Sequence, residues 1–424
     1  MTVSPALLSL LALALVMVAS FGTRVNVGVL AVALAWPVAM YGADWNATRV
    51  LEAFPSSLFV TLVGVTLLFG VAQVNGTLAQ LTDRAMRRVG TGGARLPLLF
   101  FVLAGVLSTL GPGAIAATAL VAPLAMSAGA RAGVSPLVTA LMVANGANAG
   151  NLSPFSSVGV IVNDGMQRAG LPGHEWAVWS ANFVAHALAA LGAWVLFGRR
   201  RDNSEPTKHP AEHDPRSAPA DATVFTSAQR LTVIALVAWV IGVVIFKLHL
   251  GLAGFSVAAL LLMRHAADEA AVLKSVPWAV IVMVCGVSVL IGVLDGTGGL
   301  ELFTSLLARI ATPETVNGVI AFVTGAISTY SSTSGVVYPT FLPTVPGLVA
   351  QLGGGEPLEV ALSITVGAAL VDVSPLSTLG ALCIAALPSG RDPQPLFRAL
   401  LTWGMAMTVV GALFGLFVVP LFAR

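Results

Sequence analysis

The sequence has few charged residues and almost no cysteine. Only 9% of its 424 residues are charged, where soluble domains average roughly 25%, and 57% are apolar, with a mean hydropathy of +0.90. This shortage of charge excludes an ordinary soluble protein and indicates an integral membrane protein. Cys285 and Cys383 lie in separate apolar runs, which excludes a disulfide framework and a cysteine metal site. The formal net charge of +2 gives no reason to expect a nucleic-acid partner.

The chain also lacks the common catalytic motifs. It contains no H-E-x-x-H and no G-x-S-x-G, and no histidine lies close to a carboxylate within an apolar run. We therefore expect no enzymatic activity and no organic cofactor.

What the chain has instead is a succession of apolar runs near twenty residues long. Each is long enough to cross about 30 Å of hydrocarbon as a helix, and we count ten such spans in contact with the lipid bilayer. No Lys or Arg precedes the first run, "LLSLLALALVMVAS" at 7–20, so we expect a membrane helix there and not a secretory signal.

One segment interrupts this composition. Residues 199–228 are rich in Pro, Ala and charge, and they bury too little apolar surface to fold alone. The segment is predicted to be a cytoplasmic linker that separates a first half, residues 1–198, from a second half, residues 229–424.

The two halves repeat each other. The phrase "NLSPFSSVG" at 151–159 returns as "DVSPLSTLG" at 372–380, 221 residues later. Three pairs of segments match at nearly the same separation: 67–78 with 289–300, 105–109 with 325–329, and 135–154 with 356–375. Collinear matches at one separation indicate an internal repeat.

Each half contains one apolar stretch that is broken at its centre. The stretch at about 96–128 is cut by "STLGPG", and the one at about 315–350 by "STYSSTSG". Pro removes a backbone donor, Gly loosens the backbone and Ser and Thr compete for backbone groups, so a helix is expected to stop there. We interpret both stretches as re-entrant hairpins.

The repeated phrase breaks a second segment in each half. Ser153-Pro154 and Ser374-Pro375 interrupt the apolar segments at about 135–166 and 357–387, which predicts discontinuous helices. The sequence therefore predicts an all-α membrane protein of about ten transmembrane helices plus two re-entrant hairpins, in two inverted-topology repeats. Paired interrupted helices in such repeats are typical of secondary transporters with a site at the midplane.

The basic residues predict the orientation in the membrane. With five crossings and one hairpin per half, sixteen of the 21 Lys and Arg residues fall on one side, and Arg49, Arg168, Lys247, Arg309 and Arg424 on the other. The richer side is expected to be cytoplasmic. Both termini then face outward, and we expect a multi-pass protein of a bacterial-type inner (plasma) membrane.

The candidate site residues are polar but not basic. Neither hairpin centre and neither Ser-Pro segment holds Lys or Arg, so a bound dianion would depend on helix N-termini, hydroxyls and co-bound cations. This favours cation symport. Oxygen atoms suit a hard cation, and the candidate Na⁺ ligands are Asn148, Asn151, Ser153, Asp372 and Ser374. Asp372 is a carboxylate within a membrane segment, and it either binds sodium or takes up a proton.

Three stretches carry a family resemblance: "NAGNLSPFSSVGVI", "STYSSTSGVVYPTFLPTVPGLVAQ" and "LVDVSPLSTLGALC". They resemble the malonate/dicarboxylate carrier (MatC-type) family, which is similar to the divalent anion:sodium symporters of the ion transporter superfamily. The resemblance implies a homodimer in which a mobile transport domain carries dicarboxylate and sodium past a scaffold by an elevator motion.

The resemblance also implies where the substrate binds. The wider superfamily uses the hairpin tips and the unwound helices, which here offer Thr109, Gly111, Gly113, Ser153, Ser156, Ser332, Thr333, Ser334, Ser374 and Ser377. The Ser-Asn-Thr pattern of those tips is absent, and backbone amides would have to serve at the first tip.

Two other transport functions fit the same architecture. One is the membrane subunit of a binding-protein-dependent (TRAP-like) carrier, which would need a soluble partner. The other is a proton-coupled antiporter of the same superfamily, with which Asp372 is compatible. We expect cation-coupled uptake of a small dicarboxylate, with malonate and sodium favoured.

Overall fold

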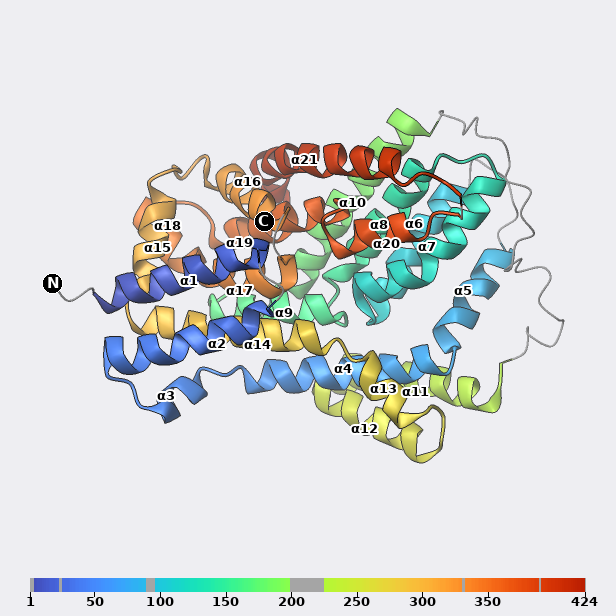
Figure 1. Cartoon of the computed structure of the whole chain (residues 1–424), viewed down its shortest axis with the longest axis horizontal. Helices are drawn as coiled ribbons and strands as arrows, with labels where there is room; N and C mark the ends of the chain where they lie inside the picture. The colour runs from blue at the N-terminus through green and yellow to red at the C-terminus, as the bar shows by residue number, and fades with distance from the viewer. Residues whose placement is uncertain are drawn as a thin grey trace.

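The computed structural model describes residues 4–22, 25–88, 96–198, 225–329, 332–388 and 390–423, and these form helices and connecting loops without a strand. Many of the longer helices run along the long axis of the molecule (Figure 1). This is the expected result for an apolar chain, because a helix satisfies its own backbone hydrogen bonds where no water is present.

The elements of the first half are α1 (Pro5–Gly22), α2 (Val27–Pro37), η1 (Val38–Gly42), α3 (Ala47–Glu52), α4 (Ser56–Val74), α5 (Thr77–Arg88), α6 (Leu96–Leu110), α7 (Gly113–Arg131), α8 (Pro136–Asn151), α9 (Ser157–Arg168) and α10 (Glu175–Phe197). Those of the second half are α11 (Ser227–Phe246), α12 (Leu250–Met263), α13 (Glu269–Ser275), α14 (Trp278–Gly296), α15 (Gly299–Ala308), α16 (Val316–Ser328), η3 (Thr333–Val337), α17 (Tyr338–Phe341), η4 (Leu342–Thr344), α18 (Val345–Leu352), α19 (Pro357–Leu370), η5 (Val371–Val373), α20 (Thr378–Ala385), α21 (Gln394–Phe417) and η6 (Val419–Leu421).

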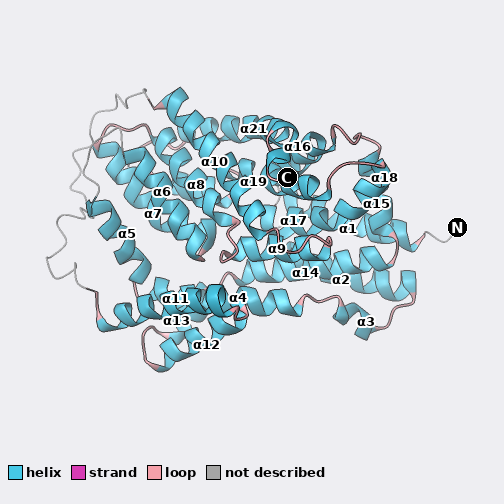
Figure 2. Cartoon of the chain, turned by 180° about the vertical axis from the view of Figure 1, so that it is seen from behind, coloured by secondary structure: helices cyan, strands magenta, loops and turns pink. Residues whose placement is uncertain are grey.

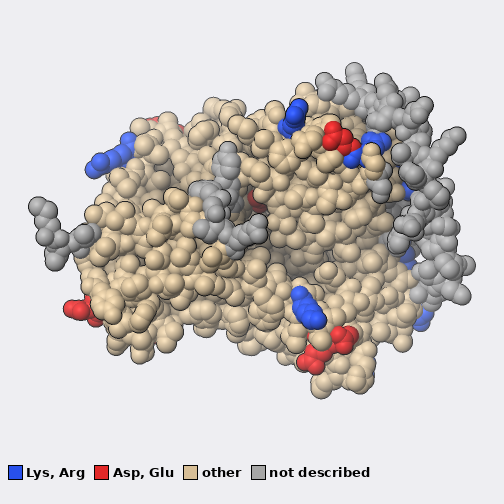
Figure 3. Space-filling view, in the orientation of Figure 1, with Lys and Arg blue, Asp and Glu red and all other residues tan. Residues whose placement is uncertain are grey.

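Within the part of the chain that the structure describes, six segments are long and apolar enough to cross a membrane. These are α4, α7, α10, α14, the segment from α19 through α20, and α21 with η6; seven shorter apolar helices of 10–17 residues accompany them among the described residues. Figure 3 shows one face of the molecule, over most of which no charged side chain lies. These features are those of a multi-pass membrane protein. The number of ten crossings and the inverted topology stay predictions.

The breaks lie where the repeated phrases stand. In the first half, α6 ends at Leu110 and α7 begins at Gly113, and α8 ends at Asn151 before α9 begins at Ser157. In the second half, α16 ends at Ser328 and η3 begins at Thr333. The helix α19 passes through the short 3₁₀ turn η5, and α20 begins at Thr378. Residues 199–224 of the predicted linker lie outside the described residues.

Glycines at equivalent positions hold helices of the two halves together. A side chain at Gly28 of α2 would meet the backbone of Val282 and Met283 in α14, and one at Gly251 of α12 would meet the backbone of Thr61 in α4. The first half's α2 therefore packs on the second half's α14, and α12 packs on α4. Close approach of helix backbones at small residues is the common way to pack helices in lipid.

The buried apolar side chains form three clusters. One cluster joins α6–α10 to α16–α21, and we call these elements the hairpin body. The second joins α4 to α11–α14, and the third joins α1–α3 to α14; we call α1–α5 with α11–α15 the outer body. Figure 2 shows α4 and α11–α13 along one side of the molecule and α6, α7, α8 and α10 on the other. Each body therefore takes elements from both halves.

The α2–α14 contact yields a test of the fold. A Cβ atom at Gly286 would lie 2.2 Å from the carbonyl oxygen of Gly28, and backbone atoms cannot move aside as a side chain can. Overpacking a core costs roughly 1–3 kcal/mol. We expect Gly286→Val to lower the thermal unfolding midpoint and the monodisperse yield in detergent. Gly192→Val is the control, because nothing lies within 4 Å of the Cβ position there; equal behaviour of the two variants would contradict the expectation.

Candidate functional site

A cavity of about 540 Å³ lies between the hairpin body and the outer body. We call it the central cavity. The hairpin body contributes both hairpin tips and both interrupted helices, and the outer body contributes α4, the end of α13 and the start of α14. Segments more than 300 residues apart in the chain, from Thr66 to Leu379, thus meet around one space, as the repeated breaks predict.

The structure brings together part of the predicted set. The central cavity is lined by Gly113, Asn148, Asn151, Ser332, Thr333, Ser334, Asp372 and Ser377. Thr109, Gly111, Ser153, Ser156 and Ser374 are not among the residues that line it. The first group contains residues of both tips, the amide and carboxylate side chains and Ser377. The second group contains further residues at the same helix breaks.

The second tip is tied to the interrupted helix by Asp372. The Thr333 hydroxyl donates to Asp372 Oδ1 at 2.6 Å and also contacts the Ser328 hydroxyl. Ser332 accepts from the Gly335 amide through its side chain at 3.1 Å, which starts the π-helical turn η3. The carboxylate thereby fixes the position of the tip hydroxyls relative to the break in the following segment.

The first tip is tied in an equivalent way by Asn151. This residue lies 221 positions before Asp372, and its Oδ1 accepts from the Ala114 amide at 3.0 Å. The N-terminus of α7 lies at this contact, with Gly113 and Ala114 in the cavity wall. The two halves thus make equivalent contacts between different groups. In the first half a side-chain amide oxygen accepts from a backbone amide, and in the second half a carboxylate accepts from a hydroxyl.

Gly111 is required by the backbone and by its neighbour. Its φ of +143° is a conformation that side chains rarely adopt, and a Cβ there would lie 1.9 Å from the ring of Phe69 in α4. The glycine therefore lets the first tip lie directly against the outer body. Its backbone amide donates to the Ser108 carbonyl at 3.4 Å.

The serines of the Ser-Pro phrases bond to the local backbone. The Ser153 hydroxyl donates to the Thr109 carbonyl at 2.7 Å and accepts from the Phe155 amide at 3.2 Å. The Ser374 hydroxyl accepts from the Leu376 amide at 3.3 Å. The bonds to the Phe155 and Leu376 amides are local, as is usual for Ser beside a helix break. The bond from Ser153 to Thr109 spans 44 residues and connects the first discontinuous helix to the first tip.

Ser377 and Ser156 follow these phrases at equivalent positions, and the structure uses them differently. Ser377 caps α20, and its hydroxyl contacts the Asp372 carbonyl and donates to the Ser374 carbonyl at 2.8 Å. The Ser156 hydroxyl is buried and has no hydrogen-bond partner among the described residues. Ser377 lines the central cavity and Ser156 does not.

Asp372 is the one ionisable side chain among the residues that line the central cavity. A carboxylate in a low-dielectric site is costly unless a cation or a proton neutralises it. Neither Lys nor Arg is present in this lining to do so. When Asp372 is ionised, the cavity attracts cations and repels anions.

Asn148 provides a further oxygen atom at the wall of the cavity. Its Nδ2 donates to the Ala369 carbonyl at 3.4 Å, and Ala369 is the residue 221 positions later. Its Oδ1 is buried without a hydrogen-bond partner. With Asp372 this gives two side chains with oxygen atoms, which is the ligand type that hard cations prefer. Asn151 Oδ1 already accepts from Ala114, and Ser153 and Ser374 lie outside the lining.

The outer body contributes polar residues to the cavity lining that were not predicted from the sequence. Thr66, Gln73 and Ser275 line the central cavity from α4 and the end of α13. Thr66 and Gln73 are single polar residues beside apolar neighbours, Ser275 follows Lys274, and none of the three belongs to a repeated break. The available signal was the seven-residue spacing of Thr66 and Gln73, which places both on one face of a helix.

Comparison with known proteins supports a transporter. Residues 3–151 match the family model described as the N-terminus of the dicarboxylate carrier protein MatC, so the resemblance predicted from the sequence is confirmed over this part of the chain. No match was found among curated protein sequences.

Two solved transporter structures share the fold. The YdaH transporter of Alcanivorax borkumensis, described as having an unusual topology, is 17% identical to this chain, with a TM-score of 0.62 over 98% of each chain. MtrF of Neisseria gonorrhoeae, from a class of antimetabolite efflux pumps, is 15% identical, with a TM-score of 0.57 over 100% of this chain and 95% of its own. At these identities the likeness concerns the fold and not the substrate.

Proposed function

We propose that the protein is a cation-coupled carrier of small dicarboxylates, with malonate as the favoured substrate and Na⁺ as the favoured coupling ion. The observation that carries the proposal is the central cavity, in which hydroxyls, amides and the α7 N-terminus surround a single carboxylate and no basic side chain. The match of residues 3–151 to a dicarboxylate carrier family supports the substrate class.

The charge in the cavity argues for coupling. A dianion that enters beside ionised Asp372 meets a negative charge in a site of low dielectric, and the hydroxyls of Ser332, Thr333 and Ser334 offset only part of that repulsion. Cations that bind first at Asp372 and Asn148 would change the sign of the local field. Binding of the anion would then depend on the cation, which is the requirement for symport.

The position of the cavity supports an elevator-type mechanism. The predicted substrate ligands belong to the hairpin body, and the opposite wall belongs to α4 and α14 of the outer body. Movement of the hairpin body along α4 and α14 would carry the ligands across the membrane while the outer body stays fixed. By resemblance, two copies would join into a homodimer, in a plasma membrane with both termini outside.

One observation favours proton coupling as a second candidate function: neither Lys nor Arg is among the residues that line the cavity with Asp372. A proton can neutralise the carboxylate as well as sodium can, and coupling would then be to protons, as in an antiporter of the same superfamily. A TRAP-like subunit is a third reading, and it requires a soluble binding protein.

Uptake of labelled malonate into proteoliposomes separates these readings. With purified protein alone, we expect uptake under an inward sodium gradient and none under a proton gradient of equal size. Uptake that follows only the proton gradient would show that the coupling ion is a proton, with Asp372 as the group that binds it. Absence of uptake under both gradients would contradict a self-sufficient malonate carrier, and succinate and a panel of other dicarboxylates would then test the substrate class.

A further inference from the structure

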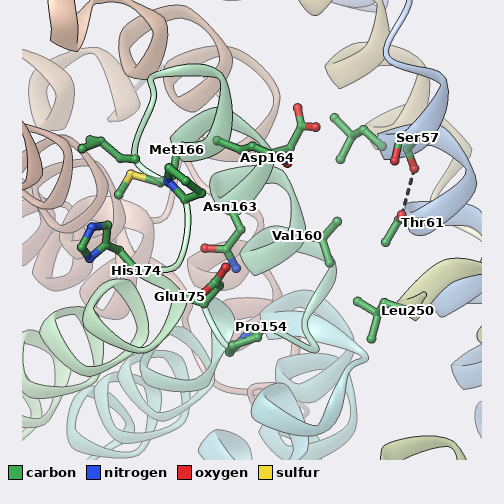
Figure 4. Close-up of a pocket in the computed structure, with 14 residues that line it drawn as sticks. Ser57, Thr61, Pro154, Val160, Asn163, Asp164, Met166, His174, Glu175 and Leu250 are labelled. Atoms are coloured by element: carbon green, nitrogen blue, oxygen red, sulfur yellow. Dashed lines mark hydrogen bonds between the residues drawn. The ribbon is translucent and has the colours of Figure 1, made fainter. Parts of the chain in front are cut away.

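A second cavity, of about 320 Å³, lies at the start of α4 (Figure 4). Ser57 and Thr61 of α4 lie on one side of it, and Asn163 and Asp164 of α9 face them from the other, with the loop that leads to α10 beside them. Thr61 donates to the Ser57 carbonyl at 2.8 Å, so its hydroxyl is anchored on its own helix. Nothing in the proposed function uses this cavity.

The second cavity and the central cavity share two helices but no lining residue. On α4, Ser57 and Thr61 line the second cavity, and the stretch from Thr66 to Gln73 lines the central one. At 1.5 Å per residue, Thr61 and Gln73 are about 18 Å apart along the axis. Around the break in the first discontinuous helix the two linings interleave: Asn151 and Val158 line the central cavity, and Pro154 and Val160 line the second. On α4 they are separate, with the second cavity toward the start of the helix and the central cavity toward its end.

Three aromatic rings in mutual contact link the linings of the two cavities. Trp239 of α11 is 5.9 Å from the ring centre of Phe69 and 6.3 Å from that of Phe155, both in edge-on contact. Phe69 lines the central cavity. The Trp239 indole donates to the Leu250 carbonyl at 3.2 Å, and Leu250 lines the second cavity. These contacts run from the wall of the central cavity to the wall of the second cavity beside α4.

The polar lining of the second cavity suits a cation. It contains the carboxylates of Asp164 and Glu175, the amides of Asn163 and Gln167, and His174, but neither Lys nor Arg. Asp164 forms an ion pair with Arg168 at 2.9 Å, whereas Glu175 forms no ion pair among the described residues. Oxygen atoms from several side chains around a space of this size fit a hydrated monovalent cation.

We propose that the second cavity is the access vestibule for the coupling cation, on the face of the membrane opposite to the one from which the central cavity is reached, with Phe69, Phe155 and Trp239 as the closed barrier. The role of the cation rests on the proposed function. The opposite access of the two cavities does not, because it is inferred from their positions toward the two ends of α4, a helix long enough to cross the membrane.

Thiol labelling tests the access. Cys285 and Cys383 are buried, so the background from native cysteines is low. We expect a membrane-impermeant thiol reagent to modify Asn163→Cys from one face of oriented vesicles and Gln73→Cys from the other. Phe155→Ala is expected to make Gln73→Cys reactive from both faces. Modification of both cysteines from the same face, or of Asn163→Cys from neither, would overturn the proposal. No transported substrate is needed, so failure of malonate uptake leaves this test intact.

Kinetics test the cation. Glu175→Gln is expected to raise the cation concentration for half-maximal uptake about threefold to fivefold, as suits a single partly exposed charge, and to leave the maximal rate unchanged. Glu301→Gln, an exposed carboxylate on α15 outside both cavities, is the control. An unchanged cation dependence in Glu175→Gln would show that the coupling cation does not pass through the vestibule. Where no transported substrate is found, cation-dependent quenching of Trp fluorescence compares the same two variants.

Discussion

Asp372→Ala is expected to lower cation-driven uptake by about tenfold to hundredfold. The substitution removes the single charge of the central cavity and also the acceptor of the Thr333 hydroxyl. A hydrogen bond to a charged group contributes about 1.5–3 kcal/mol, and each 1.4 kcal/mol is roughly a factor of ten in affinity. The measurement is the initial rate of malonate uptake as a function of sodium concentration in proteoliposomes.

Asp372→Asn separates the two losses. It keeps an oxygen for Thr333 but removes the charge, so we expect it to hold the tip in place and still fail to couple uptake to the cation gradient. Asp295→Asn, at the exposed end of α14, is the control and should behave as the parent protein. Transport by Asp372→Ala at the parent rate, with the same sodium dependence, would show that this carboxylate is not the coupling site.

The double variant Thr333→Ala/Ser334→Ala is expected to raise the KM for the dicarboxylate about tenfold or more. Both residues line the central cavity at the second tip. The Ser334 hydroxyl can donate to an anion, and the Thr333 hydroxyl, which donates to Asp372 here, can do so once a bound cation takes its place at the carboxylate. Two neutral hydrogen bonds contribute about 1 kcal/mol each. The measurement is the KM for malonate at saturating cation, which keeps a change in cation affinity out of the result.

The control for this variant is Ser256→Ala/Thr402→Ala. Both hydroxyls are exposed and bond only to carbonyls of their own helices. Thr333→Ser tests the tether to Asp372 separately, because it retains the hydroxyl that donates to Oδ1. Parent KM in the double variant would place the anion elsewhere in the cavity, and the first tip at Gly113 and Ala114 would be examined next.

The sequence located the breaks well because their chemistry is local. Gly111-Pro112-Gly113 and the Ser-Pro phrases prevent a helix from continuing whatever packs around them, and the helices end within a few residues of each. The internal repeat indicated each break twice, since Asn151 and Asp372 occupy equivalent positions in matched phrases. Their shared role at the two tips follows from that equivalence.

The functions of individual hydroxyls were less accessible from the sequence. Ser153 and Ser374 stand at the breaks, yet Ser153 bonds to the Thr109 carbonyl, and neither serine lines the cavity. A Ser beside an unwound turn can face either the backbone or the space beyond, and the direction depends on how the hairpin tip packs. Thr66 and Gln73 were missed for the opposite reason, because tertiary packing alone turns their face of α4 toward the site.

The exchange of partners between the halves bears on how the protein is made. Because α2 packs on α14 and α12 packs on α4, the surface of α2 around Gly28 stays without its partner until some 250 further residues have left the ribosome. The first half therefore cannot reach its final packing during its own synthesis. Insertion of the early helices therefore precedes their final assembly, and a chain that ended after the first half would leave the packing surface of α2 exposed and prone to aggregation.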